Sequence, residues 1–79
     1  MRFLFTMNMP SFTGNLVHQV VGDHAAATLK DLMDVMEDSD FITVIEVYKD
    51  TERRPASYYS KGQIVLNCMH IGKVKEFSE

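Results

Sequence analysis

The chain has 79 residues, a net charge of −3 and an apolar fraction of 46%. These values exclude a disordered chain and predict a single domain over residues 1–79, near the lower size limit for unaided folding. They also argue against a dedicated duplex-DNA binder, because such proteins carry a strong basic excess. Small domains often cover surplus apolar surface by self-association, so we expect a homodimer.

The cysteine content and the apolar runs predict a cytoplasmic protein. Cys68 is the single cysteine, so the chain cannot form an internal disulfide framework of the kind that stabilises small secreted domains. The short apolar run at Met1–Phe5 is followed by Thr6 and has no small-residue cleavage site, which disfavours a signal peptide. No run approaches the roughly 20 apolar residues that a membrane helix needs, so we expect no membrane partner.

Two strands are predicted before the helix. Residues 2–9 alternate strictly, with one face formed by Phe3, Phe5, Met7 and Met9. Residues 16–21 are ambiguous, because their apolar spacing also fits a helical face. Their β-branched valines and the flanking Gly14 and Gly22 favour a strand, which we expect to form a hairpin with the first.

A helix is predicted from Thr28 to about Glu37 or Asp38. Thr28 is a good N-cap, and Asp31 follows three residues later, where a carboxylate meets the positive end of the helix dipole. The apolar residues at helical spacing form one stripe: Leu29, Leu32, Met33 and Met36. We expect this stripe to pack on a sheet.

Three further strands complete the chain. Residues 41–50 are apolar on both faces, which predicts a central strand covered on both sides, or covered on the second side by another subunit. Residues 58–67 form the next strand, with a bulge or bend at Gly62. A tight turn over 67–70 leads to a last strand over 71–77, and we expect these three strands to form an antiparallel meander.

The order of these elements predicts the fold class. The pattern β-β-α-β-β-β with short connections indicates a two-layer α+β domain, with one helix packed on a mainly antiparallel sheet. The alternative is a small curled, barrel-like sheet with one helix, in which Gly62 and Gly72 supply the bends.

The residues that carry metal or nucleophile chemistry do not form a motif. A zinc site usually has two closely spaced pairs of ligands, whereas this chain offers Cys68 with His70 and two isolated histidines, His18 and His24. The apolar neighbours of Cys68 predict a raised thiol pKa and low reactivity. No phosphate-binding glycine loop or nucleophile elbow is present. We therefore predict no catalytic residues, no metal, no cofactor and no enzymatic activity.

A basic and aromatic hairpin is the candidate site. Its residues, which lie in the turn over 51–57 and in the strands on either side of it, are Tyr48, Arg53, Arg54, Tyr58, Tyr59 and Lys61. Tyrosine and arginine are typical of protein–protein hot spots, and aromatics with bases also suit stacking of single-stranded nucleic acid. The sequence therefore predicts a small non-enzymatic protein-interaction or regulatory module that acts as a homodimer. The alternative is a single-stranded nucleic-acid-binding module that uses this hairpin.

Overall fold

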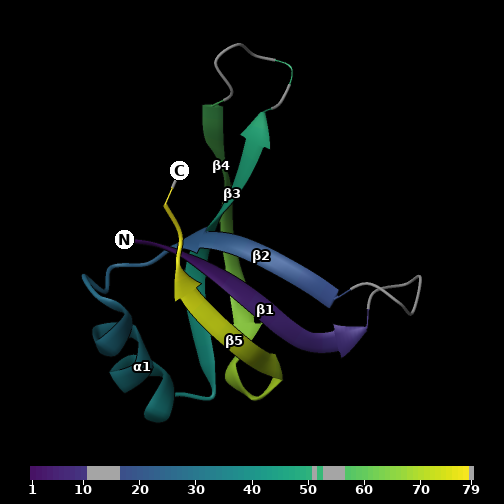
Figure 1. Ribbon diagram of the computed structural model, residues 1–79. Helices are drawn as coiled ribbons and strands as arrows, with labels where there is room; N and C mark the ends of the chain where they lie inside the picture. Colours follow the sequence, from purple (N-terminus) through teal and green to yellow (C-terminus); the bar gives the residue numbers. More distant parts are fainter. Residues whose placement is uncertain (11–16, 51, 53–56, 79) are drawn as a thin grey trace.

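The computed structural model describes residues 1–10, 17–50, 52 and 57–78, and it is an α+β fold in two layers. One open sheet of five antiparallel strands carries a single helix on one face (Figure 1). The elements in chain order are β1 (Arg2–Pro10), β2 (Val17–Asp23), α1 (Leu29–Glu37), β3 (Phe41–Asp50), β4 (Ser57–Asn67), a short 3₁₀ helix (Cys68–His70) and β5 (Ile71–Glu76). The predicted fold class and element order are confirmed, including the strand and hairpin predicted over residues 16–21.

The strand order is β4-β3-β2-β1-β5, so the predicted meander of the last three strands is wrong. β3 and β4 do form a hairpin, but β5 pairs with β1, where Phe5 lies opposite Val74. The 3₁₀ helix separates β4 from β5, and at its start the Asn67 side chain accepts a hydrogen bond from the backbone N–H of Met69 (3.0 Å). The apolar side chains of β5 are thereby added to the core beside β1 rather than beside β4.

The sheet is not closed into a barrel, so the alternative architecture does not hold. β2 and β3 are in register only at Gly22 and Asp23, which lie opposite Glu46 and Ile45. Beyond these residues the two strands diverge. The β3–β4 hairpin rises as one long arm, while β1, β2 and β5 cross it obliquely as a second arm (Figure 1). A split sheet of this kind exposes strand surface that a closed barrel would cover.

The core lies between α1 and the strands of both arms. Its fully buried side chains are Phe3, Phe5, Leu32 and Val44, and Val20, Ile42 and Leu66 pack with them. Burying one such side chain stabilises the fold by about 1.5–3 kcal/mol. β1 supplies three of the buried residues because its alternation places Phe3, Phe5 and Met7 on the side that α1 covers.

The helix begins where the sequence predicts. Thr28 has extended backbone angles, and its Oγ1 accepts a hydrogen bond from the backbone N–H of Asp31 (3.1 Å). Leu29, Leu32 and Met36 pack against the sheet, whereas Met33 is 44% exposed, so its predicted burial is wrong. α1 has only nine residues and covers a curved sheet, so the side chain at the edge of its apolar stripe remains exposed to solvent.

Two glycines shape the sheet. A Cβ at Gly22 would lie 2.7 Å from Cγ2 of Val44, so only glycine allows β2 to pack this closely against β3. Gly62 has a φ of +98°, and the β3–β4 register shifts beside it, so the predicted bulge is confirmed. Within the described residues, no helix is long and apolar enough to cross a membrane.

Candidate functional site

The predicted site residues Tyr48, Tyr59 and Lys61 come together on the β3–β4 hairpin. Tyr48 and Tyr59 lie directly opposite each other in the register, and their rings stack with centroids 6.3 Å apart. Lys61 Nζ lies 4.5 Å from the centroid of the Tyr48 ring, a cation–π contact. The bulge at Gly62 makes Lys61 the extra residue of β4, which places its ammonium beside the rings.

A carboxylate that the sequence interpretation did not include belongs to the same group. The Tyr48 hydroxyl donates a hydrogen bond to Oε2 of Glu46 (3.2 Å), two residues earlier on the same side of β3. This hydrogen bond and the negative charge of Glu46 raise the pKa of the Tyr48 phenol, since both favour its neutral form. We call Glu46, Tyr48, Tyr59 and Lys61 the tyrosine cluster. Period-two spacing from Tyr48 could have identified Glu46.

Tyr58, a residue of the predicted site, does not belong to the tyrosine cluster. Adjacent residues of a strand point to opposite faces, and Tyr58 therefore points away from Tyr59. Its ring meets the ring of Phe77 edge to face, with centroids 5.7 Å apart, and the Arg2 guanidinium lies 5.3 Å from its centroid. Tyr58 thus links the first residues of β4 to the segment after β5. Arg53 and Arg54 lie outside the described residues.

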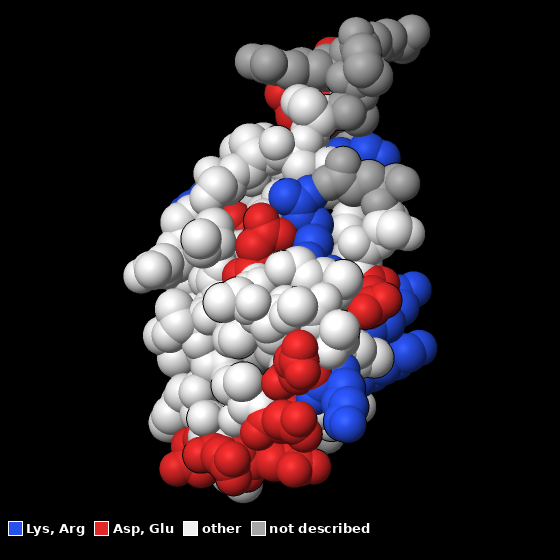
Figure 2. All heavy atoms as spheres, turned by 90° about the vertical axis from the view of Figure 1, so that its left-hand side faces the viewer, with Lys and Arg blue, Asp and Glu red and all other residues white. Residues whose placement is uncertain are grey.

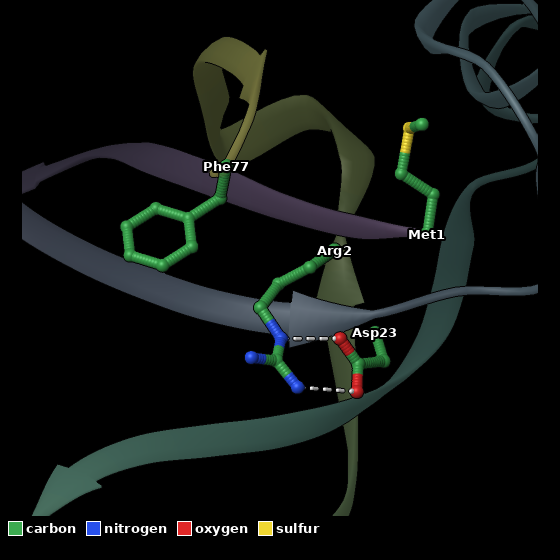
Figure 3. A pocket seen from close by; sticks show the side chains of 4 residues that line it. All are labelled: Met1, Arg2, Asp23 and Phe77. Atoms are coloured by element: carbon green, nitrogen blue, oxygen red, sulfur yellow. Dashed lines mark hydrogen bonds and ion pairs between the residues drawn. The ribbon is translucent and has the colours of Figure 1, made fainter. Parts of the chain in front are cut away.

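Arg2 and Asp23 form an ion pair that the sequence did not indicate. Arg2 Nε donates to Oδ1 of Asp23 at 2.8 Å, and Nη2 donates to Oδ2 at 3.3 Å (Figure 3). These two residues lie opposite each other in the β1–β2 register, and both are partly exposed. With Met1 and Phe77 they line a depression of about 540 Å³. Because the guanidinium already has a carboxylate and an aromatic face as partners, we assign it a structural role.

A second depression lies where β2 and β3 diverge. It has a volume of about 310 Å³, at the lower end of the range for ligand pockets. Its walls come from both arms of the sheet and are lined by His18, Gln19, Val20, Val21, Glu46, Val47, Tyr48, Lys49, Tyr58 and Phe77. No sequence signal marks this cleft, because it depends on the angle between two strands that are distant in the chain.

The Cys68 thiol is partly buried at the start of the 3₁₀ helix. Burial and then the nearby charge of Asp40 raise its pKa, which confirms the shift expected from its apolar neighbours. A thiol with a raised pKa is largely protonated at neutral pH and is a poor nucleophile. Nδ1 of His24 accepts a hydrogen bond from the backbone N–H of Ala26 (2.9 Å). Across the described ranges, no three His, Cys, Asp or Glu side chains are placed to hold a metal ion.

The other exposed feature of the hairpin is apolar. Val65 of β4 is 63% exposed and lies opposite Thr43 of β3, and Phe41, which is 59% exposed, lies diagonally beside it. Ile45 is the other diagonal neighbour and is also exposed. We call Phe41, Ile45 and Val65 the apolar face of the hairpin. Within a single chain, the prediction that β3 is covered on both sides is therefore wrong.

The acidic residues are located elsewhere. Carboxylates gather around the C-terminal end of α1 and the turn that follows it, at the lower end of the view in Figure 2. Phe41 of the apolar face directly follows this acidic turn, and the tyrosine cluster lies further along β3 and β4. Comparisons of the chain with protein-family models, with characterised proteins and with solved structures each return no match.

Proposed function

We propose that this chain is a small non-enzymatic interaction module that acts as a homodimer and binds through its β3–β4 hairpin. The observation that carries the proposal is the exposed apolar face of Phe41, Ile45 and Val65. Small monomeric proteins rarely gather large apolar side chains on one exposed patch, and such patches mark association sites.

The rest of the hairpin supports the same function. Tyr48 and Tyr59 are also exposed, and tyrosines contribute large contact area at a low cost in side-chain entropy. The single free cysteine supports a location in a reducing compartment, the cytoplasm, where a partly buried thiol persists without a disulfide partner.

A charge on the apolar face tests this function. In Val65→Lys, two ammonium groups would enter a self-association interface, so we expect the dimer dissociation constant to rise about tenfold or more. The matched control is Met33→Lys, which adds the same charge at an exposed methionine of α1 and should leave the constant unchanged.

Sedimentation equilibrium and native mass spectrometry of the purified chain would measure this constant. A wild-type chain that stays monomeric at high micromolar concentration would contradict the homodimer. Equal effects of Val65→Lys and Met33→Lys would show that the apolar face is not the binding surface.

One observation favours a second function, the binding of single-stranded nucleic acid. The Tyr48 and Tyr59 rings are stacked and exposed, and Lys61 supplies a positive charge beside them. Glu46 argues against this function, because its carboxylate lies within the same cluster and repels phosphates. For this reason we rank nucleic-acid binding below protein association.

Labelled single-stranded oligonucleotides would test the alternative. If the tyrosine cluster binds bases, Tyr59→Ala should weaken binding by about tenfold, because each stacked base contributes about 1–3 kcal/mol. Replacement of Arg53, Arg54 and Tyr59 together by alanine should also flatten the salt dependence. An unchanged affinity in these variants would eliminate the hairpin as a nucleic-acid site.

A further inference from the structure

β4 is an outer strand of the sheet, and it is the longest strand. The direction of its backbone groups follows from one hydrogen bond at its end. The Cys68 N–H donates to the carbonyl oxygen of Asp40 (2.9 Å), so Cys68 faces β3. Because antiparallel strands alternate, Ile64 and Leu66 also face β3. Gln63, Val65 and Asn67 therefore direct their N–H and C=O groups away from β3, at the outer edge of the sheet.

The side chains along this edge are apolar or neutral. Residues 62–72 contain no Asp, Glu, Lys or Arg. Natural outer strands usually carry charged residues, prolines or bulges, which prevent pairing with another chain. On β4 the features of this kind are limited to Lys61 and the bulge at Gly62. Val65 presents an exposed side chain in the middle of the neutral stretch, and Met69, just past the strand, is 83% exposed. The second half of β4 is thus an unprotected apolar edge.

Charge also decides what can occupy the edge. A symmetric dimer brings each patch against itself, so a charged patch would repel its copy, whereas a neutral one does not. On the face drawn in Figure 2, a group of acidic side chains gathers near the end of α1. In an antiparallel pair the two Asp40 residues, which lie beside Cys68, would be at opposite ends of the paired segment. A second copy of this chain therefore meets the edge without repulsion.

We infer that two copies of the chain pair antiparallel through their β4 strands, around a two-fold axis at Val65. The two five-stranded sheets then form one continuous sheet of ten strands. In this register Val65 lies opposite the second copy's Val65, and the two residues exchange N–H to C=O hydrogen bonds across the axis. The Gln63 and Asn67 amides of the two copies meet on either side of them. This inference rests on the proposed function and specifies its partner and geometry: Val65 of the apolar face lies at the seam, whereas Phe41 and Ile45 lie one strand inward.

A proline at the axis tests the backbone pairing. Val65→Pro removes the outward N–H but no hydrogen bond to β3, so the outer strand can accept it. We expect the dimer dissociation constant to rise by about 30-fold or more, since two symmetric hydrogen bonds are lost. Val65→Ala is the matched control: it loses the side chain, keeps the N–H and should weaken the dimer by about tenfold at most.

Circular dichroism and thermal unfolding would establish that both variants are folded before sedimentation equilibrium is measured. If Val65→Pro dimerises as well as Val65→Ala, the edge pairing is wrong, while a dimer sensitive to Val65→Lys would still support the proposed function. If the wild-type chain is a monomer, both proposals fail.

A cross-link provides a test that does not depend on proline. In a Cys68→Ser background, Val65→Cys should form an intermolecular disulfide under mild oxidation. Paired residues of this kind have Cα atoms about 5.5 Å apart, within the range of about 4.4–6.8 Å that disulfides span. Thr43→Cys in the same background lies one strand inward and should not cross-link. Equal cross-linking at positions 43 and 65 would overturn the edge geometry.

Discussion

The two arms of this molecule use similar side chains in different ways. On β1, Phe3 and Phe5 are completely buried beneath α1, whereas on β3 Phe41 is largely exposed. The arm of β1, β2 and β5 has α1 over one face, and the outer part of the β3–β4 hairpin has no helix over it (Figure 1). The side chains buried beneath α1, which come from both arms, therefore provide stability, whereas the outer face of the β3–β4 hairpin is available for recognition. Four predictions test this division.

The largest effect should separate two phenylalanines. Phe5→Ala should cost about 3–5 kcal/mol, because it leaves a cavity in the core. Phe41→Ala should change the free energy of unfolding by no more than about 0.5 kcal/mol, as for other surface positions. Urea unfolding at a concentration where the monomer dominates would measure both. Similar losses in the two variants would contradict the division into a stabilising core and an exposed recognition face.

Replacing either of two glycines by alanine should destabilise the fold, for different reasons. Gly22→Ala should cost about 1–3 kcal/mol by crowding Val44 at the junction of the arms. Gly62→Ala should cost about 1–2 kcal/mol from backbone strain alone, since its φ is +98° and its surroundings are open. Thermal unfolding would compare them. In a Val44→Ala background, Gly22→Ala should cost less stability than in the wild type, whereas the cost of Gly62→Ala should stay the same. If Val44→Ala reduces both costs equally, crowding of Val44 is not the specific cause of the Gly22 effect.

The cap of α1 gives a smaller effect on stability. Thr28→Ala should cost about 1 kcal/mol, because the Asp31 N–H loses the side chain that accepts its hydrogen bond. Thr28→Ser keeps an acceptor at the same place and should retain most of the stability. Urea unfolding of the three proteins is the measurement, and an equal loss in alanine and serine variants would show that the cap is not the cause.

The smallest effect concerns the tyrosine cluster. Glu46 raises the pKa of Tyr48 above its ordinary value of 10.0, so Glu46→Gln should lower it. The sign follows from the hydrogen bond, which the phenol donates only while neutral and loses as the pH rises through its folded pKa. A nuclear magnetic resonance titration of the Tyr48 ring would measure the shift. The control, Glu76→Gln, removes the same charge from β5 and should leave the pKa of Tyr48 unchanged. An equal fall in the pKa of Tyr48 in both variants would exclude the contact with Glu46 as the cause.

Local sequence features predicted much of the fold. Strict alternation identified β1, the Thr28 cap identified the start of α1, and Gly62 marked the bulge. Each of these depends on residues that are close in sequence. The candidate site was predicted less completely. Tyr48, Tyr59 and Lys61 meet as expected, but Tyr58 lies on the opposite face because adjacent strand residues alternate.

The segments that form strands and the helix could be predicted from the sequence, because hydrophobic period and capping act over a few residues. Only the folded chain shows that β5 pairs with β1, that β2 and β3 separate after two register pairs, and that Met33 remains exposed. These outcomes depend on competition between strands distant in the chain and on how far one short helix can reach across a curved sheet. Side-chain patterns record which face of a strand is apolar, but the neighbour that covers that face is chosen only when the whole chain packs.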